Sequence, residues 1–407
     1  MGVSVSYAGV DFAPERIMKD FAIAIVGAGP AGSATAIASA RLGYRVAIVD
    51  KQFFPRDKLC GDFINPINWP VFRALGVDER IRGEAHAVVR GFRLTTHFGA
   101  HAEAAFSLQD HERLLGIGLT RSRLDQVLLE KTRHEGVSLF QGCKVINLSK
   151  RSDGWTVEID CAGVSKTLQA QVLVGADGRN SWVAQRVGLS SSGDVTGRAV
   201  GFQVRLRSAF TDDKVAIHLF PGGYAGLVSL GDGTVNLCLT IDKARIVSER
   251  AEEMLFDEYL PQNPYLKKIL LSSERLGKVR WTYPVYFPPR RSSGERVVLV
   301  GDAARVSEPV TGEGVYLAMR SGLLAASTID QAFHSGDLSA ARLKRYELNC
   351  RSEFRRRRML NSLIHLAVYR PGIVSKLIGL FNQHERFLDT LVSAICAPKS
   401  IERSWLN

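Results

Sequence analysis

Three glycines near the start of the chain have a spacing that could bind a dinucleotide. They follow the apolar run 21–26 in the order Gly-x-Gly-x-x-Gly, and a small-residue segment typical of a helix comes next. The first glycine permits a tight turn, the second lets the backbone approach a pyrophosphate, and the third allows close packing of helix on strand. An acid ends the next apolar run, where its carboxylate could accept hydrogen bonds from a ribose. We therefore expect a dinucleotide to contact Gly27, Gly29, Ala31, Gly32, Asp50 and Lys51.

Two later segments repeat the design of an apolar run that ends in glycine and an acid. The first is Val-Leu-Val-Gly-Ala-Asp-Gly, and the second is Val-Gly-Asp-Ala-Ala, in which the aspartate could bond a hydroxyl of the cofactor. A Gly-Glu-Gly sequence then precedes a predicted helix, and the amides at a helix start can hold negative charge. The order of the three segments predicts one cofactor site, to which we add Asp177, Gly301, Asp302, Gly312 and Gly314.

The elements that would position these motifs alternate between strand and helix. Buried strands over 21–26 and 44–50 on either side of a small-residue helix over 31–42 form a βαβ unit, which predicts a parallel sheet. The middle of the chain is β-patterned instead, with a hairpin turn at Gly231-Asp232-Gly233. We expect further strands at 144–148, 155–159, 171–174, 199–207, 215–220, 224–241 and 295–300, and helices at 122–134, at 316–333 and from 339 onward.

This order of elements predicts an α/β fold in which a Rossmann-like nucleotide-binding domain is discontinuous along the chain. An antiparallel sheet inserted between its parts could cover a ligand, and a helical extension would follow at the C-terminus. The expected boundaries are 20–90, 111–195 and 291–338 for the nucleotide-binding parts, 91–110 and 196–290 for the substrate sheet and domain, and 339–407 for the C-terminal helices.

The chain is basic, with 53 Lys and Arg against 41 Asp and Glu and a net charge of +12. Such a balance could attract anionic cofactors or lipid headgroups, but without a clustered patch we interpret it as an ordinary enzyme surface and expect no nucleic acid partner. The exception is the arginine run 355–358, which precedes apolar residues at helical spacing. These C-terminal helices could pack on the rest of the protein, or they could form a basic amphipathic surface for peripheral membrane contact.

The six cysteines lie far apart, with no Cys-x-x-Cys pair and no histidine at zinc spacing. We therefore expect neither a disulfide framework nor a metal site, as is typical of a reducing compartment. The N-terminus has no basic region followed by an apolar core, so we expect no signal peptide and a cytoplasmic location.

The three glycine-rich segments together resemble those of the flavoprotein superfamily that contains group A aromatic hydroxylases, flavin halogenases and geranylgeranyl reductases. The stretch Pro-Arg-Asp-Lys-Leu-Cys-Gly at 55–61 resembles the Pro-x-x-Lys-x-Cys-Gly element of the branch of geranylgeranyl reductases and electron-transfer dehydrogenases. Arg121, in Arg-Ser-Arg-Leu-Asp, matches an element of the same branch whose arginine lies near FAD. The resemblance covers residues 20–335 in outline. It implies a glutathione-reductase-type domain with non-covalent FAD, whose contacts would include Arg121 and Val145.

Two residues in glycine-flanked loops are candidates for catalysis. The resemblance places Cys60 beside the flavin ring, where a thiol could deliver a proton or undergo redox chemistry, although a lone cysteine is usually a small buried apolar residue. Glu313 could relay protons on the flavin side, or it could be an acid favoured by a helix N-terminus. We interpret Lys58 as a solvated surface charge.

The resemblance implies two-electron chemistry on a hydrophobic small molecule, such as a polyketide, prenyl or quinone-type compound. Reduction or dehydrogenation of a carbon–carbon bond ranks first because of the Lys-x-Cys-Gly stretch, and oxygen-dependent hydroxylation ranks second. The line 224–229 keeps only the tyrosine of the reductases' Tyr-x-Trp-x-Phe-Pro stretch, which disfavours a geranylgeranyl substrate. The halogenase Trp-x-Trp-x-Ile-Pro pattern is absent, so halogenation ranks lower.

The sequence contains no second dinucleotide-binding motif that would bind an electron donor. No second Gly-x-Gly-x-x-Gly follows the first, so a dedicated nicotinamide domain is not expected. Electrons would come from transiently bound reduced nicotinamide or from an electron-donor protein. Outside the enzymes, a non-catalytic flavin-binding electron carrier is the alternative.

Overall fold

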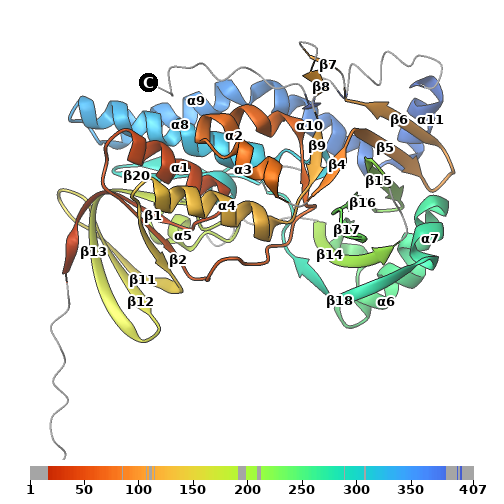
Figure 1. Ribbon diagram of the computed structural model, residues 1–407, viewed down its shortest axis with the longest axis horizontal. Coiled ribbons are helices and arrows are strands. Elements are labelled where there is room, and N and C mark those ends of the chain that lie inside the picture. The colour runs from red at the N-terminus through yellow and green to blue at the C-terminus, as the bar shows by residue number, and fades with distance from the viewer. Residues whose placement is uncertain are drawn as a thin grey trace, which may run out of the picture.

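The computed structural model describes residues 17–84, 86–106, 108–109, 112–113, 115–190, 199–208, 212–287, 289–306, 309–381, 392 and 395–396. Figure 1 shows two sheets side by side, with long helices along one face of the first. Most of the C-terminal extension beyond 381 lies outside the described residues, as does the short polar leader before residue 17.

The first sheet contains the glycine-rich segments, and its central strands run parallel. Its order is β10-β2-β1-β13-β12-β11, with β20 paired to β13 and β19 paired to β20. Five strands pair in parallel with one another, namely β10, β2, β1, β13 and β20. The pairs β11–β12 and β12–β13 are antiparallel. The bounds are β1 Ile17–Val26, β2 Val46–Asp50, β10 Ser138–Gln141, β11 Cys143–Lys150, β12 Trp155–Cys161, β13 Val164–Gly175, β19 Ser293–Gly294 and β20 Val297–Leu299.

The central strands are apolar over Phe21–Val26, Val46–Val49 and Val172–Val174, because both faces of the sheet are covered there, as parallel sheets require. Along β1, Ile23 and Ile25 pack on the helix side, whereas Ala24 and Val26 pack on the side of the β11–β12 hairpin. The helices of the first side are α1 Pro30–Arg41, α4 Arg121–His134 and α8 Gly314–His334, with α2 Trp69–Leu75, α3 Asp78–Gly83 and α9 Ala340–Glu353 packed beside them.

Small residues let α1 and α8 pack closely. A Cβ at Gly322 of α8 would lie 2.5 Å from the Ala31 carbonyl oxygen of α1, so only glycine fits there. The two helices carry the two glycine-rich loops at their N-termini, so this contact brings the loops together.

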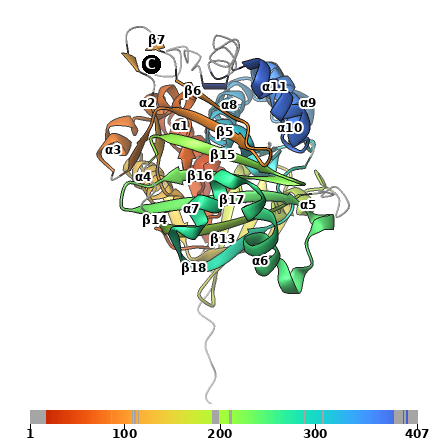
Figure 2. The same ribbon diagram turned by 90° about the vertical axis from the view of Figure 1, so that its right-hand side faces the viewer.

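The second sheet has the order β18-β14-β17-β16-β15-β5-β6 and is antiparallel except for the β15–β5 pair. Its outer face is covered by α6 Ala251–Glu253, a π-helical turn Met254–Tyr259 and α7 Pro264–Leu271, as Figure 2 shows. The other face borders the first sheet's loops. The bounds are β5 Gly91–Thr96, β6 His101–Ala105, β14 Ala199–Ser208, β15 Lys214–Phe220, β16 Gly223–Ser229, β17 Thr234–Asp242 and β18 Ser273–Thr282.

The remaining elements join the two sheets or follow them. A three-stranded sheet in the order β3-β9-β4 lies between them, and a two-residue pair forms β7 and β8. After α9 come α10 Arg355–Val368 and α11 Pro371–Phe381, so the arginine run begins α10. The short elements are β3 Phe63–Ile64, β4 Ala87–Val89, β7 Leu108–Gln109, β8 Glu112–Arg113, β9 Gly116–Gly118 and α5 Trp182–Arg186. The prediction of an α/β fold with a second β-rich part and C-terminal helices is confirmed.

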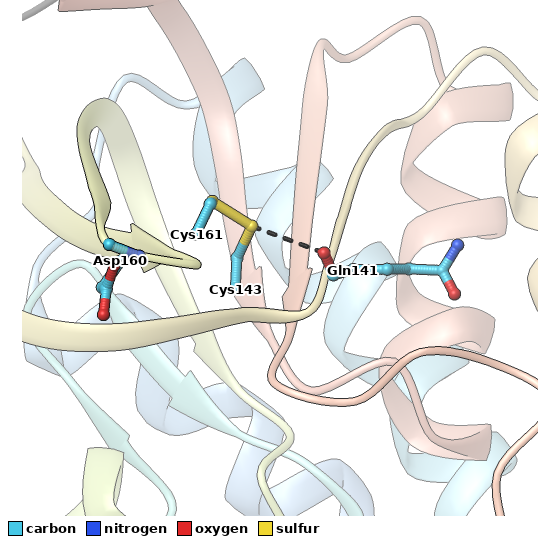
Figure 3. The surroundings of a disulfide bond; sticks show 5 residues. Gln141, Cys143, Asp160 and Cys161 are labelled. Carbon is cyan, nitrogen blue, oxygen red and sulfur yellow. Dashed lines mark hydrogen bonds between the residues drawn. A yellow bond between two sulfur atoms is a disulfide. The ribbon is translucent and has the colours of Figure 1, made fainter.

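The expectation that the cysteines form no disulfide is wrong. Figure 3 shows a bond between Cys143 on β11 and Cys161 on β12. The two residues are 18 apart in sequence, but the antiparallel pairing of β11 with β12 places them directly opposite each other. Spacing rules for short motifs do not detect a pair that a hairpin creates.

Within the described part of the chain, the structure has neither a metal-binding cluster nor a membrane-spanning helix. No group of three or more His, Cys, Asp or Glu side chains there is arranged to hold a metal ion. No helix within those ranges has the length and apolar character needed to span a bilayer.

Candidate functional site

A cavity of about 560 Å³ lies where the glycine-rich loops of the first sheet face the second sheet. Its volume is in the range typical of small-molecule and cofactor sites. Of the residues predicted from sequence, it is lined by Gly27, Gly29, Ala31, Asp50, Lys51, Cys60, Arg121, Asp177, Asp302, Gly312 and Gly314. The fold therefore brings together segments that are almost 300 residues apart in the chain.

Two glycines of the first loop are required by the packing of the protein itself. Gly27 has φ +105°, and a Cβ there would lie 2.3 Å from the Ala176 carbonyl oxygen. A Cβ at Gly32 would lie 1.9 Å from the Gly27 carbonyl oxygen. Gly32 does not border the cavity, so its role is the close packing of helix on strand.

Gly29 is different, because the protein leaves room beside it. A Cβ there would meet only Arg56 Nη2, at 3.5 Å, which is an ordinary contact. Gly314, at the start of the 21-residue helix α8, has no atom within 4 Å of the same position. Both glycines border the cavity, so the space that a side chain would occupy is open to a ligand at two helix N-termini.

Asp50 is fixed at the end of β2 by two backbone amides. Its Oδ2 accepts a hydrogen bond from Ala28 N at 2.8 Å, and its Oδ1 accepts one from Gln52 N at 2.9 Å. The carboxylate thus ties the glycine loop to the second strand. Each oxygen keeps a further lone pair that could accept a ribose hydroxyl.

Two arginines border the cavity and share one buried acid. Arg121 Nε and Nη2 each lie 2.9 Å from the Asp125 carboxylate, and Arg56 Nη1 lies 3.3 Å from Asp125 Oδ2. Burial lowers the pKa of Arg121, but Asp125 and Cys60 outweigh burial and the net shift is upward. Arg56 was not among the predicted residues, although it belongs to the Pro-x-x-Lys-x-Cys-Gly stretch. Two guanidinium groups therefore offer positive charge to an anionic group in the cavity.

Cys60 borders the same cavity, and side chains of the second sheet hold its backbone in place. Its carbonyl oxygen accepts hydrogen bonds from Gln203 Nε2 at 2.8 Å and Asn236 Nδ2 at 2.9 Å. Burial raises the pKa of the Cys60 thiol, although Arg121 acts in the opposite direction. The group therefore stays a thiol near neutral pH, which favours proton donation over the chemistry of a thiolate.

Lys58 also borders the cavity, and the residue as a whole is exposed, in keeping with the expectation of a solvated charge. Burial lowers the pKa of this amine, while Asp302 partly offsets that effect. Asp302 Oδ2 lies 3.8 Å from Arg179 Nη2, and Arg179 is a second lining residue that the sequence analysis did not assign. Both basic groups thus gather around the acid of the third glycine-rich segment.

Asp177 borders the cavity, but its carboxylate is used by the protein. Its Oδ1 accepts a hydrogen bond from Ser181 Oγ at 2.6 Å, and its Oδ2 accepts one from Val183 N at 3.0 Å. Burial raises the pKa of Asp177, and these bonds partly offset the effect. The acid of the second segment therefore fixes the start of α5 beside the cavity.

Besides Gly32, two further predicted cofactor contacts, Val145 and Gly301, lie outside the lining. Val145 is buried on β11 between the sheet and its hairpin cover. Gly301 has φ +57°, a Cβ there would lie 2.8 Å from Ala31 Cβ, and its amide donates to Ser321 Oγ at 2.9 Å. Gly301 therefore allows the third segment to pack on α1.

Glu313 is directed away from the cavity, so its placement does not support the proposed proton relay. Its carboxylate is 1% exposed and forms an ion pair with Arg357 of α10. Asn361 Nδ2 donates to Glu313 Oε2 at 2.9 Å, and Thr311 Oγ1 donates to the same oxygen at 3.3 Å. Through these contacts, Glu313 links the loop that contains Gly312 and Gly314 to α10.

The opposite wall of the cavity is apolar and comes from the second sheet. Strands β15, β16 and β17 contribute it, through Val215, Ile217, Tyr224, Leu227 and Leu239. A polar wall of glycine loops and arginines thus faces an apolar wall within one cavity.

Comparison with known proteins agrees with this site. A family model described as an FAD-binding domain matches residues 20–358. Conditioned medium factor receptor 1 of Dictyostelium discoideum is 28% identical, over 86% of this chain and 71% of its own. A 1H-pyrrole-2-carbonyl-[peptidyl-carrier protein] chlorinase of Pseudomonas fluorescens is 25% identical, over 81% and 80%. Digeranylgeranylglycerophospholipid reductase 1 of Methanothermobacter thermautotrophicus is 25% identical, over 81% and 82%.

Solved structures share the fold. A geranylgeranyl bacteriochlorophyll reductase-like protein from Thermoplasma acidophilum has a TM-score of 0.76 at 20% identity, over 93% of this chain and 95% of its own. A flavin-dependent brominase has a TM-score of 0.76 at 19% identity, over 94% and 96%.

The cavity fits FAD by its own geometry. The space beside Gly29 and Gly314 is open to a pyrophosphate and a ring system, Asp50 can accept a ribose hydroxyl, and Arg56 and Arg121 can balance phosphate charge. Because the family model covers most of the chain and the site has the expected parts, this protein belongs to the FAD-binding domain family and is an FAD-dependent oxidoreductase.

Proposed function

We propose that this enzyme reduces a carbon–carbon double bond of a hydrophobic small molecule, or catalyses the reverse dehydrogenation. One observation supports this proposal above the others: Cys60 and the apolar wall of β15–β17 border the same cavity as the FAD-binding loops. A hydrophobic substrate on that wall would lie between the second sheet and the cofactor, within reach of a protonated thiol.

The proposed reaction balances with an external two-electron donor. When bound, FAD would supply the two electrons as a hydride equivalent, and reduced nicotinamide or an electron-donor protein would be their external source. The double bond then loses its π bond, gaining the hydride on one carbon and a proton on the other. Cys60 donates that proton and regains one from water, while the apolar wall binds the substrate and excludes solvent.

Oxygen-dependent chemistry, either hydroxylation or halogenation, is the second candidate. The chlorinase among the relatives favours it, whereas the digeranylgeranylglycerophospholipid reductase favours the reductase. Both candidates use the same FAD-binding loops, so the reaction with substrate must distinguish them.

We expect the reduced enzyme to be reoxidised by its substrate in the absence of oxygen. The FAD-loaded protein would be reduced chemically under anaerobic conditions and mixed with prenylated quinones and polyunsaturated prenyl lipids. The flavin absorbance is then followed while the products are analysed by mass spectrometry. A reductase restores the oxidised flavin spectrum and yields a product with two added hydrogens.

The same experiment has an outcome that contradicts the proposal. If the flavin stays reduced with every candidate until air and a halide are admitted, and the product then carries an oxygen or a halogen atom, the second candidate is correct. Reoxidation by an acceptor protein alone, with no small-molecule product, would identify an electron carrier.

We expect Cys60→Ser to retain FAD but to slow the anaerobic reoxidation step by about 100-fold, which is the lower end of the range for loss of a general acid. Serine fills nearly the same space, but its hydroxyl is a far poorer proton donor than a thiol. The measurement is the single-turnover rate at saturating substrate, together with the FAD content of the purified variant.

Cys238→Ser is the matched control. Cys238 is a second free thiol that borders the cavity, and it lies on β17, where burial also raises the pKa of its thiol. Its replacement is expected to change the rate only slightly. Equal losses in the two variants would mean that Cys60 acts through packing and not through its proton.

A further inference from the structure

A second cavity, of about 440 Å³, lies behind the start of α8. It is enclosed by α8, α9, α10 and the loops 289–292 and 301–305. It shares Asp302, Gly314 and Ala318 with the FAD cavity, but it is lined by none of the residues of the first glycine loop. The two cavities are therefore neighbours that meet at the third glycine-rich segment, and the first glycine loop borders only the FAD cavity.

The lining of this second cavity is strongly basic. Arginine and lysine side chains from four different elements border it, namely Arg290, Arg291, Arg305, Lys344, Arg351 and Arg358, together with Arg357. The acids in the lining are Asp302 and Glu347. Such an excess of like charge in one concave space costs free energy unless an anion compensates it.

Neither acid neutralises this excess. Glu347 Oε1 accepts hydrogen bonds from Ser292 N at 2.8 Å and Ser293 N at 3.0 Å, and Glu347 Oε2 lies 3.9 Å from Arg351. Asp302 pairs with Arg179, which borders the FAD cavity and not this one. Asp302 is thus engaged by Arg179, and Glu347 by two backbone amides and Arg351, so neither carboxylate pairs with Arg305, Arg358 or Lys344.

Arg305 is the most informative of the basic residues. Its Nε is buried and has no hydrogen-bond partner among the described residues, and no described carboxylate lies within ion-pair distance of it. Burial and the nearby Arg358 lower the pKa of Arg305. Arg358 itself donates to the Arg351 carbonyl oxygen at 3.2 Å and has no acidic partner within the described ranges. Two half-buried arginines therefore border one cavity with no carboxylate partner among the residues that the structure describes.

We propose that this cavity binds the phosphate or diphosphate group of a ligand, through Arg305, Arg358 and Lys344. Phosphate oxygens match the fork geometry of guanidinium groups and carry the charge that the cluster lacks. The cavity is much larger than an inorganic phosphate, so the ligand has an organic part as well.

Two sources could supply the phosphate. One is a soluble phosphorylated molecule, and the other is the headgroup of an anionic lipid. The second source is consistent with α10, which lines the cavity and also carries an exposed apolar row of Met359, Leu363 and Leu366, with exposed fractions of 64%, 66% and 52%. An apolar row beside basic residues is typical of helices that lie on anionic membranes.

The test uses the full-length FAD-loaded protein and inorganic pyrophosphate, measured by isothermal titration calorimetry. We expect one site whose affinity falls as salt rises. Arg305→Gln and Lys344→Gln are each expected to weaken binding about tenfold or more, because each removes a charge-assisted hydrogen bond. FAD content and thermal unfolding are measured for each variant, and the exposed position of Lys344 makes its variant informative even where Arg305→Gln is unstable.

Arg356→Gln is the matched control, since it removes the same charge from an exposed position of α10 that does not border the cavity. Sedimentation with phosphatidylglycerol vesicles identifies the source: binding that pyrophosphate displaces indicates a lipid headgroup, and pyrophosphate binding without vesicle binding indicates a soluble ligand. The proposal is overturned if folded wild-type protein does not bind pyrophosphate. It is equally overturned if Lys344→Gln and Arg356→Gln weaken binding alike.

Discussion

Gly29→Ala is expected to give a folded protein that no longer retains FAD. The backbone at Gly29 has φ −74° and ψ −176°, which any residue can adopt, and the new Cβ would meet only the end of the Arg56 side chain, at 3.5 Å. The methyl group would instead enter the cavity, where the family's second glycine lets the backbone approach the pyrophosphate. Loss of two charge-assisted hydrogen bonds at about 1.5 kcal/mol each would weaken FAD binding by about 100-fold or more.

Gly32→Ala is the contrasting variant in the same loop. Its Cβ would lie 1.9 Å from the Gly27 carbonyl oxygen, and backbone atoms cannot move aside as a flexible side chain can. We expect a loss of about 3 kcal/mol or more in the free energy of unfolding, at the upper end of the cost of overpacking. Urea unfolding of the FAD-free proteins and fluorescence titration with FAD separate the two effects.

The two variants should therefore lose different properties, one its FAD affinity and the other its stability. Gly29→Ala should unfold at nearly the wild-type urea concentration but bind FAD weakly. Gly32→Ala should unfold at a lower urea concentration than wild type even when both proteins are free of FAD. If Gly29→Ala binds FAD as tightly as wild type, the pyrophosphate does not pass this glycine and the assignment of the cavity is wrong.

Sequence patterns predicted the parts of this site that depend on the local backbone. The spacing of Gly27, Gly29 and Gly32 between an apolar strand and a small-residue helix specifies a turn geometry within six residues, and the acid at the end of β2 follows from the same unit. Continuous apolar runs identified the buried parallel strands in the same way. Each of these features is encoded by residues close together in the chain.

Features that depend on distant contacts could not be predicted from sequence. The ion pair of Glu313 joins residues 44 apart, and the choice of Arg357 among four consecutive arginines depends on how α10 packs against α8. The Cys143–Cys161 bond depends on the register of a hairpin. Arg56 and Arg179 were not assigned to the site, because nothing nearby in the sequence shows that a cavity wall faces them.

Arg357→Met is expected to destabilise the protein strongly, by about 3–5 kcal/mol. The substitution leaves the buried Glu313 carboxylate, which is 1% exposed, without its guanidinium partner. Because Glu313 lies between Gly312 and Gly314, which both border the FAD cavity, the loop should also loosen and FAD affinity should fall. Urea unfolding measures the loss of stability, and FAD titration measures the loss of affinity. Lys150→Met is the control: it breaks an ion pair with Glu295 at the surface, and almost no loss of stability is expected from it.

The double variant Arg357→Met with Glu313→Gln decides whether charge is the cause. A neutral amide can keep the hydrogen bonds of Asn361 and Thr311 to the Glu313 position without a buried, unpaired charge. We therefore expect the double variant to be more stable than Arg357→Met alone, since removing both members of a buried pair costs less than stranding one of them. If the double variant is instead as unstable as the single variant, Arg357 acts through its packing on the Tyr316 ring and not through the ion pair.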